Sequence, residues 1–334
     1  MRVLVTGAGG FIGRHLVAAL LAGGHAVVTL SRRTAPPFPD LPHLAIAVEH
    51  EAVVAAVQDV DLVVHLAGLA DASASWRAPL TYARVNATGT LHLLEGARQA
   101  GAGFILASTQ RVYRPRAVPV AEDAPTEPTD PYGYSKLVAE RWVELYHRHY
   151  GVPTTIVRLF SVYGPGQVAG GGTSGVVAIF LREALAGRPL RVFGHQFRDF
   201  VEVSDVARGL WLVAERLAAG NVDHGTVARR ATPPVYNLGT GRATSLHELA
   251  ALVRATLGVD VPIEECAPDR PTESDVADVR RIAADLGFQA QVGLEEGLHR
   301  FASWYREQCK DSPEGAADTR SVGRPAPAAD GRRP

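Results

Sequence analysis

The chain has 334 residues, a formal net charge of −1, 46% hydrophobic residues and 21% charged residues. This length exceeds the usual size of one domain, so we expect one main domain with a smaller companion. The composition excludes a disordered chain and a fibre, and the near-zero charge gives no general attraction to nucleic acid. No apolar run is long enough to span a bilayer, so neither a nucleic-acid partner nor membrane attachment is expected.

The chain contains two cysteines, Cys266 and Cys309. Neither lies at a metal-ligand spacing, and the pair does not resemble a disulfide framework, so no metal site is expected. After Met1 and Arg2 the chain enters a predicted strand directly, without the apolar stretch of a signal peptide. These features favour the reducing cytoplasm.

Short apolar runs rich in Val, Ile and Leu recur along the first half, separated mostly by helical stretches. They lie at Val3–Thr6, Ala26–Leu30, Leu44–Val48, Leu62–Leu66, Phe104–Ser108 and Thr155–Leu159. Runs that are apolar at consecutive positions suit strands buried on both faces, as in a parallel sheet covered by helices. The pattern predicts an α/β fold with a Rossmann-like, doubly wound parallel sheet.

The pattern then changes and later returns. A helix at Val176–Ala186 and a strand at Leu190–Phe193 indicate an inserted lobe, whereas a helix at Val203–Ala219 and a strand at Val235–Leu238 fit the first domain. Ser245 opens a C-terminal helical segment. We therefore expect a smaller, interleaved C-terminal lobe. The predicted division is 1–165 with about 200–241 for the Rossmann domain, 166–199 with 242–310 for the lobe, and 311–334 for a disordered tail.

A glycine motif follows the first predicted strand and opens a helix. Gly7, Gly10 and Gly13 let the backbone turn tightly and approach a pyrophosphate, and the helix that begins at Phe11–Ile12 supplies N–H donors. The strand and helix on either side make the motif informative for dinucleotide binding. Its spacing is three-and-three, not the two-and-three of ordinary dehydrogenases.

The second predicted strand ends without the acidic residue that usually holds the ribose hydroxyls of NAD. Ser31, Arg32 and Arg33 follow Leu30 instead. An arginine at this place can pair with a 2′-phosphate, which favours NADP. The alternative is a pair of solvated surface arginines beside NAD, so NAD or NADP is predicted.

Tyr132 and Lys136 lie one turn apart at the start of a predicted helix that runs through Leu137–His149. A phenol titrates near 10 in water, and a neighbouring ammonium would bring its pKa toward the operating pH. Tyr134 is the nearby alternative, but two residues from Lys136 it would point away from the ammonium. We therefore predict Tyr132 as the acid or base.

Ser108 and Thr109 follow a buried strand, at the carboxyl edge where open α/β sheets bind their ligands. A hydroxyl there can bind the reacting oxygen. Together with the glycine turn, this order of motifs predicts an enzyme site.

The chain resembles the extended short-chain dehydrogenase/reductase family, which comprises nucleotide-sugar epimerases, dehydratases and reductases, over about residues 1–307. The resemblance rests on the segments 6–13, 65–68, 86–90, 108–113 and 132–136 in the cofactor half and on 158–167, 198–206, 236–241 and Arg270 in the substrate half.

This resemblance implies a role for each matching residue. Thr109 would bind the sugar oxygen, Tyr132 would exchange its proton, and Lys136 would tune Tyr132 and hold the nicotinamide ribose. The implied cofactor contacts also include Leu66, Ala67 and Asn86, and the implied substrate contacts are Ser108, Ser161, Arg198 and Arg270, with both arginines on the diphosphate. The resemblance further implies a homodimer paired through helices at Leu91–Gln99 and Leu137–His149.

Several positions depart from the family pattern. Gln110 and Arg111 stand where family dehydratases carry an Asp-Glu pair, which argues against a 4,6-dehydratase. Ser161 replaces a frequent Asn, and the loop 194–198 is shorter than usual, so the substrate pocket and the nucleotide base stay open. Glu202 and Arg114 also stand where many members have His and Gly.

Three functions compete. A nucleotide-sugar epimerase, of the 4-epimerase type, would oxidise a sugar hydroxyl transiently and reduce the ketone on its other face. An NADPH-dependent keto-sugar reductase would deliver hydride once, and Arg32 and Arg33 favour it. A non-catalytic dinucleotide-binding regulator would have no need of Thr109, Tyr132 and Lys136 together. We expect the epimerase.

Overall fold

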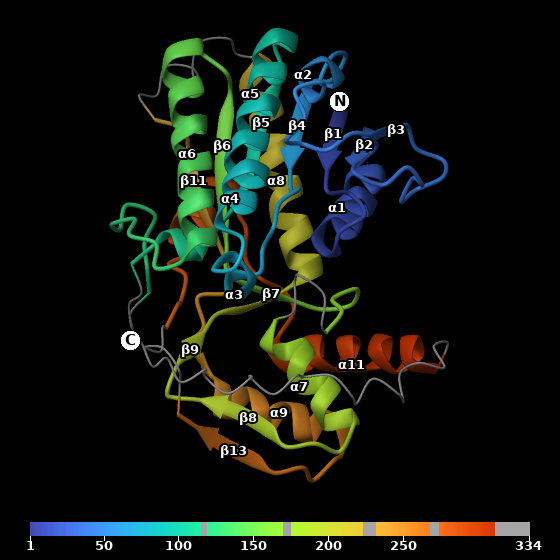
Figure 1. Cartoon of the computed structure of the whole chain (residues 1–334), viewed down its shortest axis with the longest axis vertical. Helices are drawn as coiled ribbons and strands as arrows, with labels where there is room; N and C mark the ends of the chain where they lie inside the picture. Colours follow the sequence, from blue (N-terminus) through green and yellow to red (C-terminus); the bar gives the residue numbers. More distant parts are fainter. Residues whose placement is uncertain (115–118, 170–174, 223–231, 268–273, 311–334) are drawn as a thin grey trace, which may run out of the picture.

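The computed structural model describes residues 1–114, 119–169, 175–222, 232–267 and 274–310. A layered α/β part occupies the top of Figure 1, and a smaller lobe lies below it. Residues 311–334, which we predicted as a disordered tail, lie outside the described residues, and so does Arg270.

The α/β part is built on a seven-stranded sheet of order β11-β6-β5-β4-β1-β2-β3. Every neighbouring pair in it is parallel. The strands are β1 (Arg2–Thr6), β2 (Ala26–Ser31), β3 (His43–Ala45), β4 (Leu62–His65), β5 (Gly103–Thr109), β6 (Thr154–Leu159) and β11 (Val235–Leu238). The predicted Rossmann-like parallel sheet is confirmed. Its order reverses between β1 and β4, which is where such sheets bind ligands.

Helices cover both faces of this sheet and bury a separate apolar core on each. On one face the core holds side chains of α1 (Phe11–Ala22), α8 (Val203–Val222) and α10 (Arg280–Leu286). On the other it holds those of α2 (Val53–Ala56), α5 (Gly89–Ala100) and α6 (Pro131–Tyr150). Strands such as β4 and β6 are buried along their whole length, because apolar residues at consecutive positions feed both cores.

The lobe has a core of its own. Its elements are α7 (Val176–Leu185), β8 (Leu190–Phe193), α9 (Leu246–Leu257), β13 (Ile263–Cys266) and α11 (Leu294–Lys310). Two short strand pairs connect it to the sheet part, β7 (Ser161–Tyr163) with β10 (Phe200–Glu202) and β9 (Phe197–Arg198) with β12 (Thr244–Ser245). The chain thus enters the lobe, returns for α8 and β11, and enters it again. We propose that the predicted domain limits coincide with these crossings.

The third strand differs from its prediction at Leu44–Val48. It spans His43–Ala45 at the edge of the sheet, with β2 as its neighbour. Val48 leaves the sheet and is buried against Gly89, the first residue of α5. The apolar run therefore continues into core packing after its backbone pairing ends.

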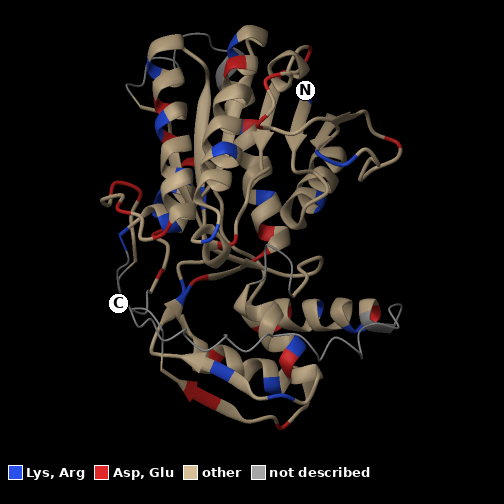
Figure 2. Cartoon of the chain, viewed as in Figure 1, with Lys and Arg blue, Asp and Glu red and all other residues tan. Residues whose placement is uncertain are grey.

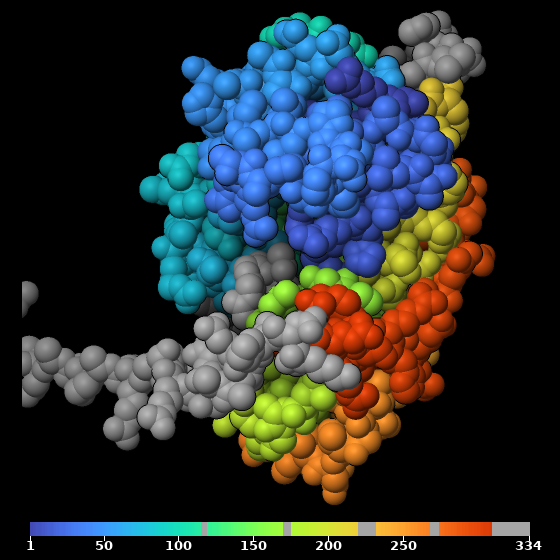
Figure 3. All heavy atoms as spheres, turned by 90° about the vertical axis from the view of Figure 1, so that its right-hand side faces the viewer, coloured from blue at the N-terminus to red at the C-terminus, as the bar shows by residue number. Residues whose placement is uncertain are grey.

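Basic and acidic residues are mixed over the surface. In Figure 2 basic and acidic residues are interspersed over the helices of both parts, while β13 is acidic. Figure 3 shows the N-terminal α/β part stacked directly on the C-terminal lobe. Among the described residues, no helix is long and apolar enough to cross a membrane.

Candidate active site

The glycine turn joins β1 to α1 at the point where the strand order reverses. Gly7 has a left-handed φ of 70°, and a Cβ there would lie 2.8 Å from the Ala67 nitrogen. A Cβ on Gly13 would overlap the carbonyl oxygen of Gly7. The Gly10 amide donates to that same oxygen at 2.9 Å, and α1 begins at the next residue, Phe11. Only glycines permit this turn, which brings the helix N-terminus to the edge of the sheet.

The segment after β4 packs directly against this turn. The Ala67 amide donates to the Thr6 hydroxyl at 3.1 Å, which holds Leu66 and Ala67 beside Gly7. The Asn86 side chain accepts from the Leu69 amide at 2.8 Å and donates to the Ser135 hydroxyl at 2.9 Å. Asn86 lies in the π-helical turn η1 (Ala83–Thr88), a conformation that often marks functional sites. Its side chain therefore ties the β4 loop to α6, which is a structural contact.

The two arginines at the end of β2 are exposed. The main chain of Arg33 is fixed, because its amide donates to the Ser31 hydroxyl at 3.3 Å and its carbonyl accepts from His43 at 2.9 Å. The Leu30 carbonyl accepts from the Gly7 amide at 3.0 Å, so this strand end adjoins the glycine turn. The arginines are thus placed where a ribose 2′ position would lie in such folds.

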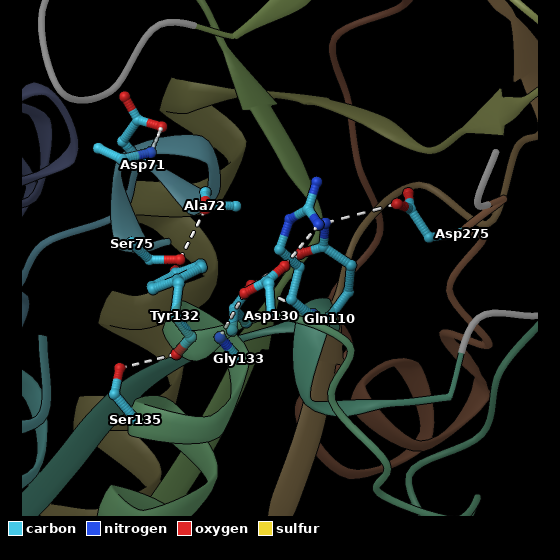
Figure 4. Close-up of polar contacts among 12 residues, drawn as sticks. Asp71, Ala72, Ser75, Gln110, Asp130, Tyr132, Gly133, Ser135 and Asp275 are labelled. Carbon is cyan, nitrogen blue, oxygen red and sulfur yellow. Dashed lines mark hydrogen bonds and ion pairs between the residues drawn. The ribbon is translucent and has the colours of Figure 1, made fainter. Parts of the chain in front are cut away.

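Thr109 and Tyr132 meet at one cavity, from the end of β5 and the first turn of α6. Tyr132 and Thr109 both line this cavity, and the Thr109 hydroxyl donates to Gln110 at 2.9 Å. Figure 4 shows Tyr132 between helix α3 (Ala72–Ser75) and the Gln110 segment. The cavity has a volume of about 380 Å³, and its lining includes Phe11, Ile12, Ser108, Thr109, Tyr132, Ser161 and Arg198.

The first turn of α6 is set by its cap. Asp130 accepts from the Gly133 amide at 2.7 Å, and Pro131 occupies the first helical position. This start places Lys136, which is buried, one turn beyond Tyr132. Tyr134 is 57% exposed, whereas Lys136 is buried, and Tyr134 is not among the residues that line the cavity.

Burial dominates the protonation of both helix residues. It lowers the pKa of Lys136 to about 8, although the Glu140 carboxylate acts in the opposite direction. It also raises the pKa of Tyr132, while the Thr109 hydrogen bond and the Arg111 charge act to lower it. The predicted direction for Tyr132 was a lowered pKa and is wrong for this structure, because loss of hydration outweighs the nearby positive charges.

Ser108 belongs to a buried ionic network that sequence reasoning missed. Its hydroxyl donates to Glu140 at 2.5 Å, and Glu140 pairs with Arg158 through bonds of 3.0 and 2.7 Å. Burial opposes the charge of Arg158, but the Glu140 carboxylate raises its pKa above the ordinary value. Ser108 therefore lines the cavity, but its hydroxyl proton is directed at the buried Glu140 carboxylate. Glu140 lies one turn beyond Lys136, but nothing in the local sequence indicates its burial.

The cavity lining also includes Arg198, which we predicted to grip a diphosphate. Its guanidinium pairs with Asp275 and donates to Gln196 at 2.8 Å. Next to it, Asp199 accepts from the Thr240 amide at 2.8 Å and the Gly241 amide at 2.9 Å, which anchors β9 to the loop after β11. Ser161 also lines the cavity, whereas Arg270 lies outside the described residues. Asp275 and Asp199 act through contacts distant in sequence, so no local signal marks them.

Comparison with known proteins identifies the family. The model of the NAD dependent epimerase/dehydratase family matches residues 3–239. The chain belongs to this family. It is 34% identical to the UDP-glucose 4-epimerase of Mycolicibacterium smegmatis, over 92% of this chain and 99% of the relative. UDP-glucuronic acid decarboxylase 1 of Xenopus tropicalis is 31% identical, over 98% of this chain and 76% of the relative.

Solved structures of this family have the same fold. MoeE5 in complex with UDP-glucuronic acid and NAD is 34% identical and aligns with a TM-score of 0.81, covering 92% of this chain and all of that chain (100%). The protein is therefore a member of a family of NAD-dependent enzymes that act on nucleotide-sugars, as its sequence predicted.

Within the family, the positions that depart from the dehydratase pattern have definite contacts here. Gln110 accepts from Thr109 and donates to Asp275 at 3.5 Å. Arg111 donates to Asp130 at 2.9 Å. Both residues line the cavity, but neither an amide nor a guanidinium supplies the carboxyl acid and base of a dehydratase. Among the described residues, no cluster of His, Cys, Asp or Glu is arranged to hold a metal ion.

Proposed function

We propose that this protein is an NAD(P)-dependent nucleotide-sugar epimerase, of the 4-epimerase type. The observation that carries the proposal is the cavity that Thr109 and Tyr132 line together with Phe11 and Ile12 after the glycine turn and with Arg198. A phenol and a hydroxyl at one point suit proton exchange with a sugar alcohol. A guanidinium suits a diphosphate.

The residues around the glycine turn fit a dinucleotide. Glycine at positions 7 and 13 avoids steric overlap with the backbone of Ala67 and of Gly7, so the turn can close tightly. The amides that begin α1, at Phe11 and Ile12, would then face the pyrophosphate. When bound, the nicotinamide supplies the site that accepts and returns hydride. In our proposal Lys136, together with Leu66, Ala67 and Asn86, completes this site.

The chain's own residues would handle the proton and the orientation of the sugar. Tyr132, as the phenolate, would accept the proton of the sugar hydroxyl and, as the neutral phenol, would return it, and Thr109 would hold the same oxygen. Arg198 would exchange its pairing with Asp275 for the substrate diphosphate. Ser161, and Arg270 outside the described residues, would add contacts to the substrate.

A second candidate is an NADPH-dependent keto-sugar reductase, favoured by Arg32 and Arg33. Both side chains are exposed at the end of β2, and no carboxylate stands there to repel a 2′-phosphate. The bound dinucleotide distinguishes the two. Denaturing fresh protein and identifying the released dinucleotide by mass spectrometry should give near-stoichiometric NAD for an epimerase. An empty protein that binds NADPH reversibly would support the reductase.

Turnover tests the catalytic assignment directly. We expect the wild-type chain to convert UDP-glucose or UDP-glucuronic acid to its 4-epimer. Chromatography of the nucleotide-sugars measures this conversion. Tyr132→Phe should reduce kcat by at least about a hundredfold while sparing dinucleotide binding. Tyr134→Phe is the matched control, because that phenol is exposed and does not line the cavity, and it should retain activity. Dinucleotide binding without turnover of either sugar, and without NADPH-dependent reduction of a nucleotide-keto-sugar, would favour the non-catalytic regulator.

We also propose that the protein acts in the cytoplasm as a homodimer. Tyr134, Val138 and Tyr150 on α6 are 57%, 45% and 55% exposed, and Leu80 on α4 (Pro79–Tyr82) is 85% exposed. Pairing of α5 and α6 with those of a second copy would cover such apolar side chains. Light scattering of the purified protein should give twice the chain mass, and a monomer mass would contradict the proposal.

A further inference from the structure

We propose that the Arg111–Asp130 ion pair is a positioning device for Tyr132, which fixes the phenol against Thr109 and sets the charge that surrounds it. This inference rests on the proposed function, because it concerns the proton exchange assigned to Tyr132. It adds two residues to the machinery that the sequence motifs do not indicate.

The pair ties together the two elements that carry the reacting hydroxyls. The Arg111 guanidinium donates to one Asp130 oxygen at 2.9 Å, and the other Asp130 oxygen accepts from the Gly133 amide at 2.7 Å. The Arg111 amide donates to the Thr109 hydroxyl at 3.2 Å. The end of β5 is thereby connected through one ion pair to the turn that holds Tyr132. Figure 4 shows the Asp130–Gly133 contact within that turn.

Both charges are shielded from water. The Asp130 side chain is 6% exposed and the Arg111 side chain 29% exposed. Arg111 also lines the cavity together with Thr109 and Tyr132. Charges that are partly removed from water act more strongly on their neighbours, so this pair influences the phenol more than a surface pair would.

The two members of the pair act on Tyr132 in opposite directions. Burial raises the pKa of the phenol most, the Arg111 charge lowers it, and the Asp130 charge raises it. Tyr82 of α4 packs edge-on against the same ring and raises the pKa slightly further. Asp71, at the start of α3, lines the same cavity, and Lys136 follows on the helix of Tyr132 itself.

An arginine at this place has one chemical property that matters. It stays protonated at every accessible pH, so it neither accepts nor supplies the proton that a glutamic acid would exchange there. It contributes a fixed positive charge and a planar guanidinium that donates a hydrogen bond to Asp130. A neutral Asn would serve the cap of α6 equally well, so the charge of Asp130 can be removed while the cap is kept.

The test separates the charge effect from a structural one. Arg111→Gln removes the cation, whereas Asp130→Asn removes the anion and keeps the helix cap. We expect the ionisation of Tyr132 to move to higher pH in the first variant and to lower pH in the second, each by about one pH unit. The readouts are the pH profile of kcat for epimerisation and the ultraviolet absorbance of the phenolate, taken as the difference from the same background carrying Tyr132→Phe.

Two further variants distinguish a charge effect from a folding defect. Arg111→Lys keeps a cation and should stay near the wild-type profile, and the double variant lacking both charges should lie between the two single variants. Shifts in the same direction, or no shift in either, would overturn the proposal and leave the pair a purely structural link. Opposite shifts of the phenolate absorbance in a chain that turns over no nucleotide-sugar would uphold the pair and refute the epimerase.

Discussion

At the scale of single residues, Glu140 is a fully buried carboxylate that accepts hydrogen bonds from both Ser108 and Arg158. Replacing one member of a buried pair leaves the other charge without compensation. We expect Glu140→Gln to lower the free energy of unfolding by about 3–5 kcal/mol, measured by urea denaturation. Glu144→Gln is the control on the same helix, since its bond to Arg141 is solvent-exposed. It should cost less than about 1 kcal/mol.

Lys136 gives a prediction about pH. Its pKa falls through burial to about 8, from an ordinary value of 10.5. Between about pH 8 and pH 10.5 the Lys136 amine binds a proton in the unfolded chain but not in the folded chain. The free energy of unfolding should therefore rise as the pH increases across this window. The slope should reach up to about 1.4 kcal/mol per pH unit. Urea denaturation of dinucleotide-free protein measures it, and Lys136→Met should remove the rise. An equal slope in both proteins would contradict the assignment.

At the scale of an element, the glycine turn has little tolerance for added atoms, because backbone atoms surround it. An alanine at Gly13 places its Cβ against the carbonyl oxygen of Gly7 and the backbone of Ala8. The turn would have to open, which should cost about 1–3 kcal/mol of stability. It should also weaken NAD binding, measured by calorimetric titration. Gly293→Ala is the control, because a Cβ there meets nothing within 4 Å. Unchanged NAD affinity in Gly13→Ala would exclude this turn as the pyrophosphate site.

At the scale of the whole molecule, Asp199 joins three distant segments. It accepts from Thr240 and Gly241 after β11 and from the Ala277 amide at 3.1 Å, and its neighbour Arg198 lines the cavity. Asp199→Ala leaves these buried donors without an acceptor and should cost about 3 kcal/mol or more, measured by thermal denaturation. Asp285→Ala is the control. It removes one bond, from the Tyr236 hydroxyl at 3.0 Å, and should cost about 1 kcal/mol.

Local sequence determined the parts of this protein that depend on short spacings. Buried strands such as β4 and β6 follow from consecutive apolar residues, because both faces of a covered sheet are dry. The glycine turn follows from three glycines between a strand and a helix. Tyr132 and Lys136 follow from helical spacing, which also separates Tyr134 from them. Asp130 before Pro131 is a helix-start signal that could have been read in the same way.

Tertiary structure alone decided what these residues touch. The partners of Arg198, Arg111 and Ser108 lie 77, 19 and 32 residues away along the chain, so no local pattern specifies them. The protonation of Tyr132 follows the same rule. The spacing to Lys136 is local and indicates a lowered pKa, whereas the burial that raises it depends on how α6 packs against the rest of the fold. Spacing along a chain fixes which side chains share a face, but desolvation and ion pairing arise only when distant segments exclude water together.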